Sequence, residues 1–156
     1  MNREKIIPLF IEKLEKELKV ISDIAEKSRQ SATDKEFKQE AKYDTRAIEE
    51  GYLAGAQAKR VEELKQDLSL LQALSMTSSK EIREGSIIKV SVDEKEQYYL
   101  VYRGSGGIKI SYNDTEVSTL SVKSKIASEI LGLEESDFAV VETPRGEKEF
   151  HILEVY

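Results

Sequence analysis

Apolar side chains recur at alternating spacings of three and four residues over the first part of the chain, at Ile11, Leu14, Leu18, Ile21 and Ala25. This spacing is typical of the buried seam of a coiled coil, because it keeps one apolar stripe facing a partner helix. Glutamates and lysines fill the positions between, as expected of a solvated face. The pattern predicts a helix that begins between Arg3 and Pro8, has a seam that fades toward Ser28, and ends at residues 29–33.

A second helical pattern runs from about Lys35 to Met76, so the two are expected to form an antiparallel hairpin with its tip at about residues 29–38. Thr33 or Asp34 is expected to cap the second helix, and Thr33 has capping-box spacing to Glu36. Small residues in the middle of this helix predict close approach of the two helices toward the tip: Ala47, Gly51, Ala54, Gly55 and Ala58.

The pattern changes to short strands after Ile82, which indicates a second domain. Strands are expected at residues 86–92, 97–102, 108–112, 138–142 and 147–155, and one short helix at 124–131. The predicted fold class is therefore α+β: a helical hairpin, residues 1–78, followed by a small antiparallel β domain with one short helix, residues 79–156.

Composition narrows the function classes. The chain has no cysteine, which excludes disulfides and thiolate chemistry, and its single histidine, His151, is read as a strand residue without a role. A net charge of −6 argues against general affinity for nucleic acid, which needs basic patches. The first residues lack the apolar run of a signal peptide or membrane span, so a cytoplasmic protein is expected.

Carboxylates are concentrated at the expected tip. Glu36, Glu40 and Asp44 follow one another at i,i+4 and would share one helix face, with Asp34 just before them. Two interpretations remain open on these residues alone. They form a solvated helix N-terminus that favours acids, or they form an acidic face that a long rod carries to a distant site.

Several motifs in the second half follow one another in a recognisable order. These are Ser121–Ala127 (S-V-K-S-K-I-A), Ile130–Leu133, the acidic turn 134–137, and the final hairpin from Val140 to Phe150. They resemble the Gre transcript-cleavage factors of bacterial RNA polymerase, in which the first motif reads S-V-x-S-P-I-A. In the rod, Glu40–Tyr43 and Glu49–Tyr52 are similar to the family's N-A-E-Y and E-x-x-G-F segments.

The resemblance implies a coiled coil attached to an FKBP-like domain, and a transcription elongation factor rather than an autonomous enzyme. The globular domain would hold RNA polymerase at the rim of its secondary channel, through Ser121, Lys123, Ser124 and Ile126. The rod would enter the channel, where Asp34, Glu36 and Glu40 promote cleavage of backtracked RNA. Glu36 and Glu40 would help to hold a second Mg²⁺ at the polymerase active centre. RNA and DNA would be met only within the elongation complex, and a monomer without membrane contact is expected.

Two departures from the family pattern keep a second function open. Counting back from Tyr43, the family's tip Asp falls on Glu36, but its tip Glu falls on Gln39, which offers no carboxylate. Lys125 stands where the family often has proline. The alternative is a regulator that occupies the secondary channel without promoting cleavage. A third hypothesis, a peptidyl-prolyl isomerase or chaperone, rests on the FKBP-like fold alone.

Overall fold

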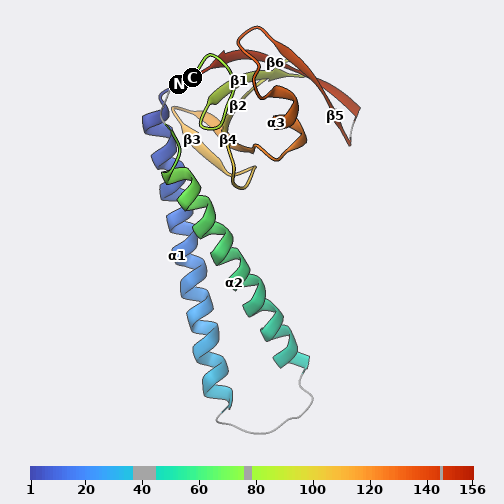
Figure 1. The fold of residues 1–156 in the computed structure, drawn as a ribbon. Coiled ribbons are helices and arrows are strands. Elements are labelled where there is room, and N and C mark those ends of the chain that lie inside the picture. The colour runs from blue at the N-terminus through green and yellow to red at the C-terminus, as the bar shows by residue number, and fades with distance from the viewer. Residues whose placement is uncertain (37–44, 76–78, 145) are drawn as a thin grey trace. The chain divides into compact units, whose positions relative to one another are not determined.

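The computed structural model describes residues 1–36, 45–75, 79–144 and 146–156. The chain forms two compact units. One unit comprises Lys13–Leu68, and the other comprises Met1–Glu12 together with Ser69–Tyr156 (Figure 1). The ends of both long helices thus belong to the unit that contains the sheet. The domain limits expected from the sequence, 1–78 and 79–156, stay a prediction.

Two long helices form the first part of the chain, as predicted: α1 spans Arg3–Glu36 and α2 spans Thr45–Gln72. The predicted bounds of the second helix are wrong, because Lys35 belongs to α1 and α2 ends at Gln72, before Met76. The predicted end of the first helix at residues 29–33 is wrong, because α1 continues to Glu36. Thr33 and Asp34 therefore lie inside a helix, where they cannot act as the N-cap of the next one. The stretch from Arg29 to Glu36 contains no glycine or proline to stop the helix. None of the helices in these ranges is long and apolar enough to cross a membrane.

The rod unit is packed along part of its seam. Leu14 of α1 and Leu64 of α2 are fully buried. Beside them the Arg60 guanidinium donates two hydrogen bonds to Oε1 of Glu17, from Nη2 at 2.7 Å and Nε at 3.2 Å. The hydrogen bond to Glu17 raises the pKa of Arg60, although burial opposes the shift. An ion pair therefore joins the two helices next to the leucine seam.

The expected close approach through small residues is not found in the described part of α2. Ala54 and Ala58 are exposed, and a Cβ added to Gly55 would meet no atom within 4 Å. Val20 and Ile24 of α1 are exposed as well. A small side chain permits close packing but supplies little apolar area to drive it. The larger side chains of Leu14 and Leu64 are therefore the ones that are buried.

The second part of the chain forms a six-stranded sheet in the described residues, in the order β3-β4-β2-β1-β6-β5. The elements are β1 (Ile87–Val92), β2 (Lys95–Tyr102), β3 (Lys109–Tyr112), β4 (Thr115–Ser121), α3 (Lys125–Ile130), β5 (Phe138–Thr143) and β6 (Gly146–Val155). No strand in the described ranges precedes Ile82, so the predicted α+β arrangement is confirmed.

One strand of this sheet was not anticipated. β4 follows β3 through Asn113 and Asp114, whose positive φ angles of 50° and 60° make a tight two-residue turn. β4 then pairs with β2 in parallel, with Tyr98 beside Val117 and Tyr102 beside Ser121. The sheet is thus antiparallel except for the β2–β4 pair, which brings the end of β4 and the loop after it next to β2.

A core lies on the face of the sheet that carries α3. Ala127 and Ile130 of α3 are fully buried with side chains from the strands, among them Val90, Val101 and Ile152. On β1 the core residues Ile88, Val90 and Val92 occupy alternate positions, as the two-residue period of a strand requires. The short helix is therefore fixed to the sheet by its two apolar residues.

The opposite face is also buried over β1, β2 and β4, at Ile87, Leu100, Tyr102 and Val117. The same unit contains fully or almost fully buried residues from the helix ends, Ile6, Phe10 and Leu71. We infer that these two sets form a second core. The Arg3 guanidinium donates to the Ser75 carbonyl at 2.7 Å, which joins the start of α1 to the segment after α2.

Gly85 lies at the same place with a φ of 88°. A side chain there would come within 3.0 Å of the Ser75 carbonyl oxygen and 3.1 Å of the Arg3 guanidinium. The close approach of the three segments thus requires glycine before β1.

Candidate functional site

The segment that joins β4 to α3 is held in one conformation by hydrogen bonds. Val122 N–H donates to the Tyr102 carbonyl at 2.8 Å, and Ser124 N–H donates to the Ser121 carbonyl at 2.9 Å. Ser124 then caps α3, because its hydroxyl oxygen accepts from Ala127 N–H at 3.1 Å. The predicted partner-binding residues Ser121, Lys123 and Ser124 therefore lie on a rigid turn.

Ser124→Ala should destabilise the sheet-containing unit by about 1 kcal/mol, because the cap of a short helix is lost. Ser124→Asp retains an oxygen that can accept the same bond, and its free energy of unfolding should stay close to that of the original chain. Urea unfolding, followed through the amide signals of the sheet, distinguishes the two. Equal destabilisation by both variants would contradict a capping role.

Lys125, where the resembled family often has proline, is the first residue of α3. Proline is well tolerated at this position because the N–H of the first helical residue has no partner within the helix. Ser124 has an extended backbone, with ψ at 152°, which is also the conformation that a following proline favours. The lysine instead forms an ion pair with Glu142 at 2.8 Å, which lowers the pKa of that carboxyl group. The departure thus leaves the start of the helix unaltered.

An open groove of about 1050 Å³ lies beside this turn and is lined by residues of β2, β3 and β4. Ser121, Lys123 and Ser124 line one part of it, and Tyr99 and Lys109 line another. Ile126, the fourth predicted partner-binding residue, does not line the groove and packs partly against the core under α3. The structure thus brings three of the four predicted residues together at the groove.

The wall of the groove is fixed by polar contacts. The Thr119 hydroxyl donates to the Ser105 carbonyl at 2.8 Å and accepts from Ile108 N–H at 3.0 Å, which holds the glycine-containing loop after β2. Lys109 forms an ion pair with Glu116 at 2.8 Å, and this hydrogen bond raises the pKa of the lysine. The lining of the groove therefore includes the Lys109–Glu116 ion pair as well as neutral polar groups.

Tyr99 supplies an aromatic ring to the same surface. Its hydroxyl donates to Oε1 of Gln97, and burial raises the pKa of the phenol, although Lys109 opposes the shift. The phenol is thus neutral at physiological pH, and the ring can contact apolar groups of a bound partner.

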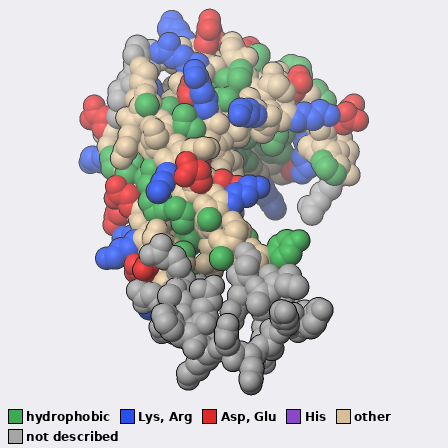
Figure 2. Space-filling model, turned by 60° about the horizontal axis from the view of Figure 1, so that its bottom comes forward, with side chains coloured by type: hydrophobic (Ala, Val, Ile, Leu, Met, Phe, Trp, Pro, Cys, Tyr) green, Lys and Arg blue, Asp and Glu red, His purple; other side chains and the backbone are tan. Residues whose placement is uncertain are grey.

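The side chains of the predicted acidic tip residues lie outside the described part of the structure. Asp34 and Glu36 belong to the last turn of α1, but their side chains lie outside the described part, and Glu40 lies outside the described residues altogether. Within the described ranges no group of three or more His, Asp or Glu side chains could hold a metal ion. Acidic and basic side chains are interspersed over the face seen in Figure 2.

A family model described as "Transcription elongation factor, GreA/GreB, C-term" matches residues 77–156, half of the chain, including the turn and the groove. The chain belongs to the GreA/GreB family of transcription elongation factors.

Curated relatives agree with this family membership. The chain is 28% identical over 143 residues to "Transcription elongation factor GreA" of Yersinia pestis, a match that covers 88% of this chain and 81% of the relative. It is 29% identical over 126 residues to the protein of the same name from Pasteurella multocida, covering 77% and 73%.

Solved structures similar to this family member include GreA factor homolog 1 (Gfh1) of Thermus thermophilus, with 17% identity, 94% of each chain covered and a TM-score of 0.38. Another is "Prokaryotic transcription elongation factor GreA/GreB" from Nitrosomonas europaea, with 21% identity, 63% of this chain and 90% of that chain covered, and a TM-score of 0.35.

Sequence reasoning missed the part of the groove that β2, β3 and β4 provide. Tyr99, Lys109 and Thr119 are separated along the chain, and only the parallel pairing of β2 with β4 brings them to the turn at Ser121. The available signal was Thr115–Ser121, a run with several β-branched residues that follows the turn-forming pair Asn113–Asp114.

Proposed function

We propose that this GreA/GreB family member binds RNA polymerase at the secondary channel and stimulates cleavage of backtracked RNA. The observation that carries the proposal is the groove beside the turn 121–124, within the segment that the family model matches. A preformed groove of mixed polar and apolar lining, with an aromatic ring and an exposed lysine at its margin, suits the capture of a protein surface. Ser121, Lys123 and Ser124 would contact the polymerase directly, and Ile126 would support the turn from below.

The rod would then carry the acidic residues Asp34, Glu36 and Glu40 toward the polymerase active centre. Glu36 and Glu40 would contribute carboxylate oxygens to a Mg²⁺ ion that the polymerase also holds, a proposal that rests on the family resemblance. Such an ion supplies activation of water for hydrolysis of a phosphodiester. Mg²⁺ needs only one or two protein carboxylates beside other oxygens, so a few acids at the tip suffice. In this proposal the factor assists the polymerase's own RNA cleavage and is not an enzyme by itself.

One sequence observation favours a second candidate. Gln39 occupies the position of the family's second tip carboxylate, and an amide does not supply the negative charge that a divalent cation attracts. A factor with this substitution could enter the channel and regulate the polymerase without promoting cleavage. Cleavage of a backtracked transcript by the cognate polymerase, with and without the factor, separates the two functions.

The contact with polymerase is tested at Lys123, whose side chain is exposed at the groove. Lys123→Glu should weaken polymerase binding on the order of tenfold, because reversing a charge at the margin of an interface replaces attraction with repulsion. Lys80→Glu is the matched control, since Lys80 is exposed and does not line the groove. Fluorescence titration measures both affinities, and equal affinities would exclude the groove as the contact.

A further inference from the structure

The outer edge of β5 differs from the rest of the sheet. β5 is the last strand in the order, and it pairs only with β6 among the described strands. Phe138 and Val140 are 59% and 47% exposed, although they are large apolar side chains in a regular strand. Phe138 stacks on His151 of β6, with ring centroids 5.7 Å apart. An exposed apolar edge strand of this kind tends to pair with another chain unless something covers it.

The backbone groups of the same residues also face outward. Ile152 N–H donates to the Asp137 carbonyl at 2.8 Å, and Phe138 lies opposite His151 in the register. Since bonded and non-bonded pairs alternate in an antiparallel ladder, the N–H and C=O groups of Ala139 and Val141 point to β6. Those of Phe138, Val140 and Glu142 therefore point away from it, toward the open edge.

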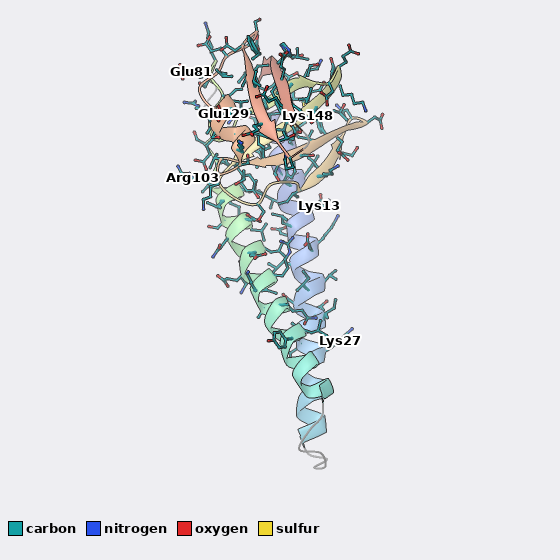
Figure 3. The ribbon with its side chains drawn as sticks, turned by 90° about the vertical axis from the view of Figure 1, so that its right-hand side faces the viewer. Lys13, Lys27, Glu81, Arg103, Glu129 and Lys148 are labelled. Atoms are coloured by element: carbon teal, nitrogen blue, oxygen red, sulfur yellow. The ribbon has the colours of Figure 1, made fainter. Side chains whose placement is uncertain are left out.

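Carboxylates surround the apolar residues on this face. Glu142 lies directly opposite Glu147, and Val140 lies opposite Glu149, so all three glutamates project from the same side of the sheet as Phe138. Like charges at opposed positions destabilise a sheet. Lys125 pairs with Glu142 from the start of α3, and His151 contacts Glu149 at 3.3 Å. Lys148, labelled in Figure 3, pairs instead with Asp93.

We infer that the edge of β5 is a docking site for an extended, basic segment of another protein, which adds to the sheet as a further strand. Main-chain hydrogen bonds to Phe138, Val140 and Glu142 hold the added strand. Apolar side chains of that strand lie beside Phe138 and Val140, and a lysine or arginine lies beside Glu142, two residues further along. The glutamates select this partner over a second copy, because two such edges would place six carboxylates on one face.

The inference is independent of the polymerase groove and is tested on the full chain without polymerase. The probe is a capped ten-residue peptide in which threonine alternates with valine in its first half and with lysine in its second half. On addition of saturating peptide, hydrogen exchange of the Phe138, Val140 and Glu142 amides should slow by at least about tenfold. A peptide with glutamate in place of each lysine should bind at least about tenfold more weakly.

Two variants separate edge pairing from a general apolar contact. Val140→Pro removes an outward-pointing N–H without removing a bond to β6, so it should abolish peptide binding in a folded chain. Val140→Thr keeps the N–H and the β-branched shape, and it should bind within about threefold of the original chain. Unchanged signals of Val141 and Phe150 show that each variant is folded.

Three results would overturn the inference. They are peptide binding without protection of the outward amides, equal binding of the acidic peptide, and protection of the same amides by self-association without any peptide. The last result, detected by sedimentation, would assign the edge to a second copy of the chain.

Discussion

Replacing Glu36 with alanine is expected to reduce cleavage of backtracked RNA by on the order of 10²-fold, with affinity for RNA polymerase nearly unchanged. The reason is the division of roles proposed above. In that proposal the groove beside residues 121–124 would contact the polymerase, whereas the tip acids would act on the metal and contribute little to binding. The loss of one group that stabilises charge in a transition state commonly has an effect of this size.

Two further variants show which carboxylate accompanies Glu36. Glu40→Ala should reduce cleavage comparably if Glu40 serves in place of the acid missing at Gln39. Gln39→Glu should raise cleavage if the family geometry is kept, and should change little if Glu40 already serves. The measurement is cleavage of a stalled, backtracked transcript at several Mg²⁺ concentrations, with binding measured in parallel. If the original chain and all variants bind but fail to cleave, the channel-occupying regulator is the correct function.

The substitution Phe10→Ala should destabilise the sheet by about 3–5 kcal/mol, although Phe10 belongs to a helix. Phe10 is fully buried and belongs to the same compact unit as the strands. If it packs in the second core with Leu100 and Tyr102, its removal leaves a cavity that rigid neighbours fill only in part. The free energy of unfolding of the sheet should therefore fall with that of the helix end.

Phe138→Ala is the matched control, because it removes the same side chain from an exposed position of the sheet itself. Its effect should stay below about 1 kcal/mol. Hydrogen exchange of the β1 and β2 amides measures the stability of the sheet directly. Loss of protection in the helices alone after Phe10→Ala would show that the second core does not exist.

Periodicity was sufficient to predict the two long helices, α3 and five of the six strands in the described residues, but not β4 or the end of α1. The helical seam that starts at Ile11 and the strands after Ile82 each bury one face at a regular spacing. Regular burial leaves a strong periodic pattern in the sequence. The end of a helix depends on a few capping interactions worth about 1 kcal/mol each. At Thr33 and Asp34 those residues were present, yet α1 continued through them to Glu36.

The candidate site shows the same division between local and distant information. The turn at Ser121 and the cap at Ser124 are local, and both lie within the motif Ser121–Ala127 on which the family resemblance rests. The groove depends on the parallel pairing of β4 with β2. This pairing places residues about twenty positions apart side by side, with β3 between them in the sequence. Nothing in the spacing of Tyr99 and Thr119 alone indicates that contact. The tip acids, in contrast, are assigned from resemblance, because their side chains lie outside the described part.

The position of β6 has a consequence for biosynthesis. β6 is the last strand of this sequence, yet it lies inside the sheet, between β1 and β5. β1, made more than fifty residues earlier, pairs on one side with β2 and on the other with β6. While the chain emerges from the ribosome, β1 and β5 each lack this neighbour, and the core residues Phe150 and Ile152 are still missing. The sheet can therefore close only after residues 146–155 have been synthesised, and a chain that stops before them exposes the unpaired edges of β1 and β5 to the cell's proteases.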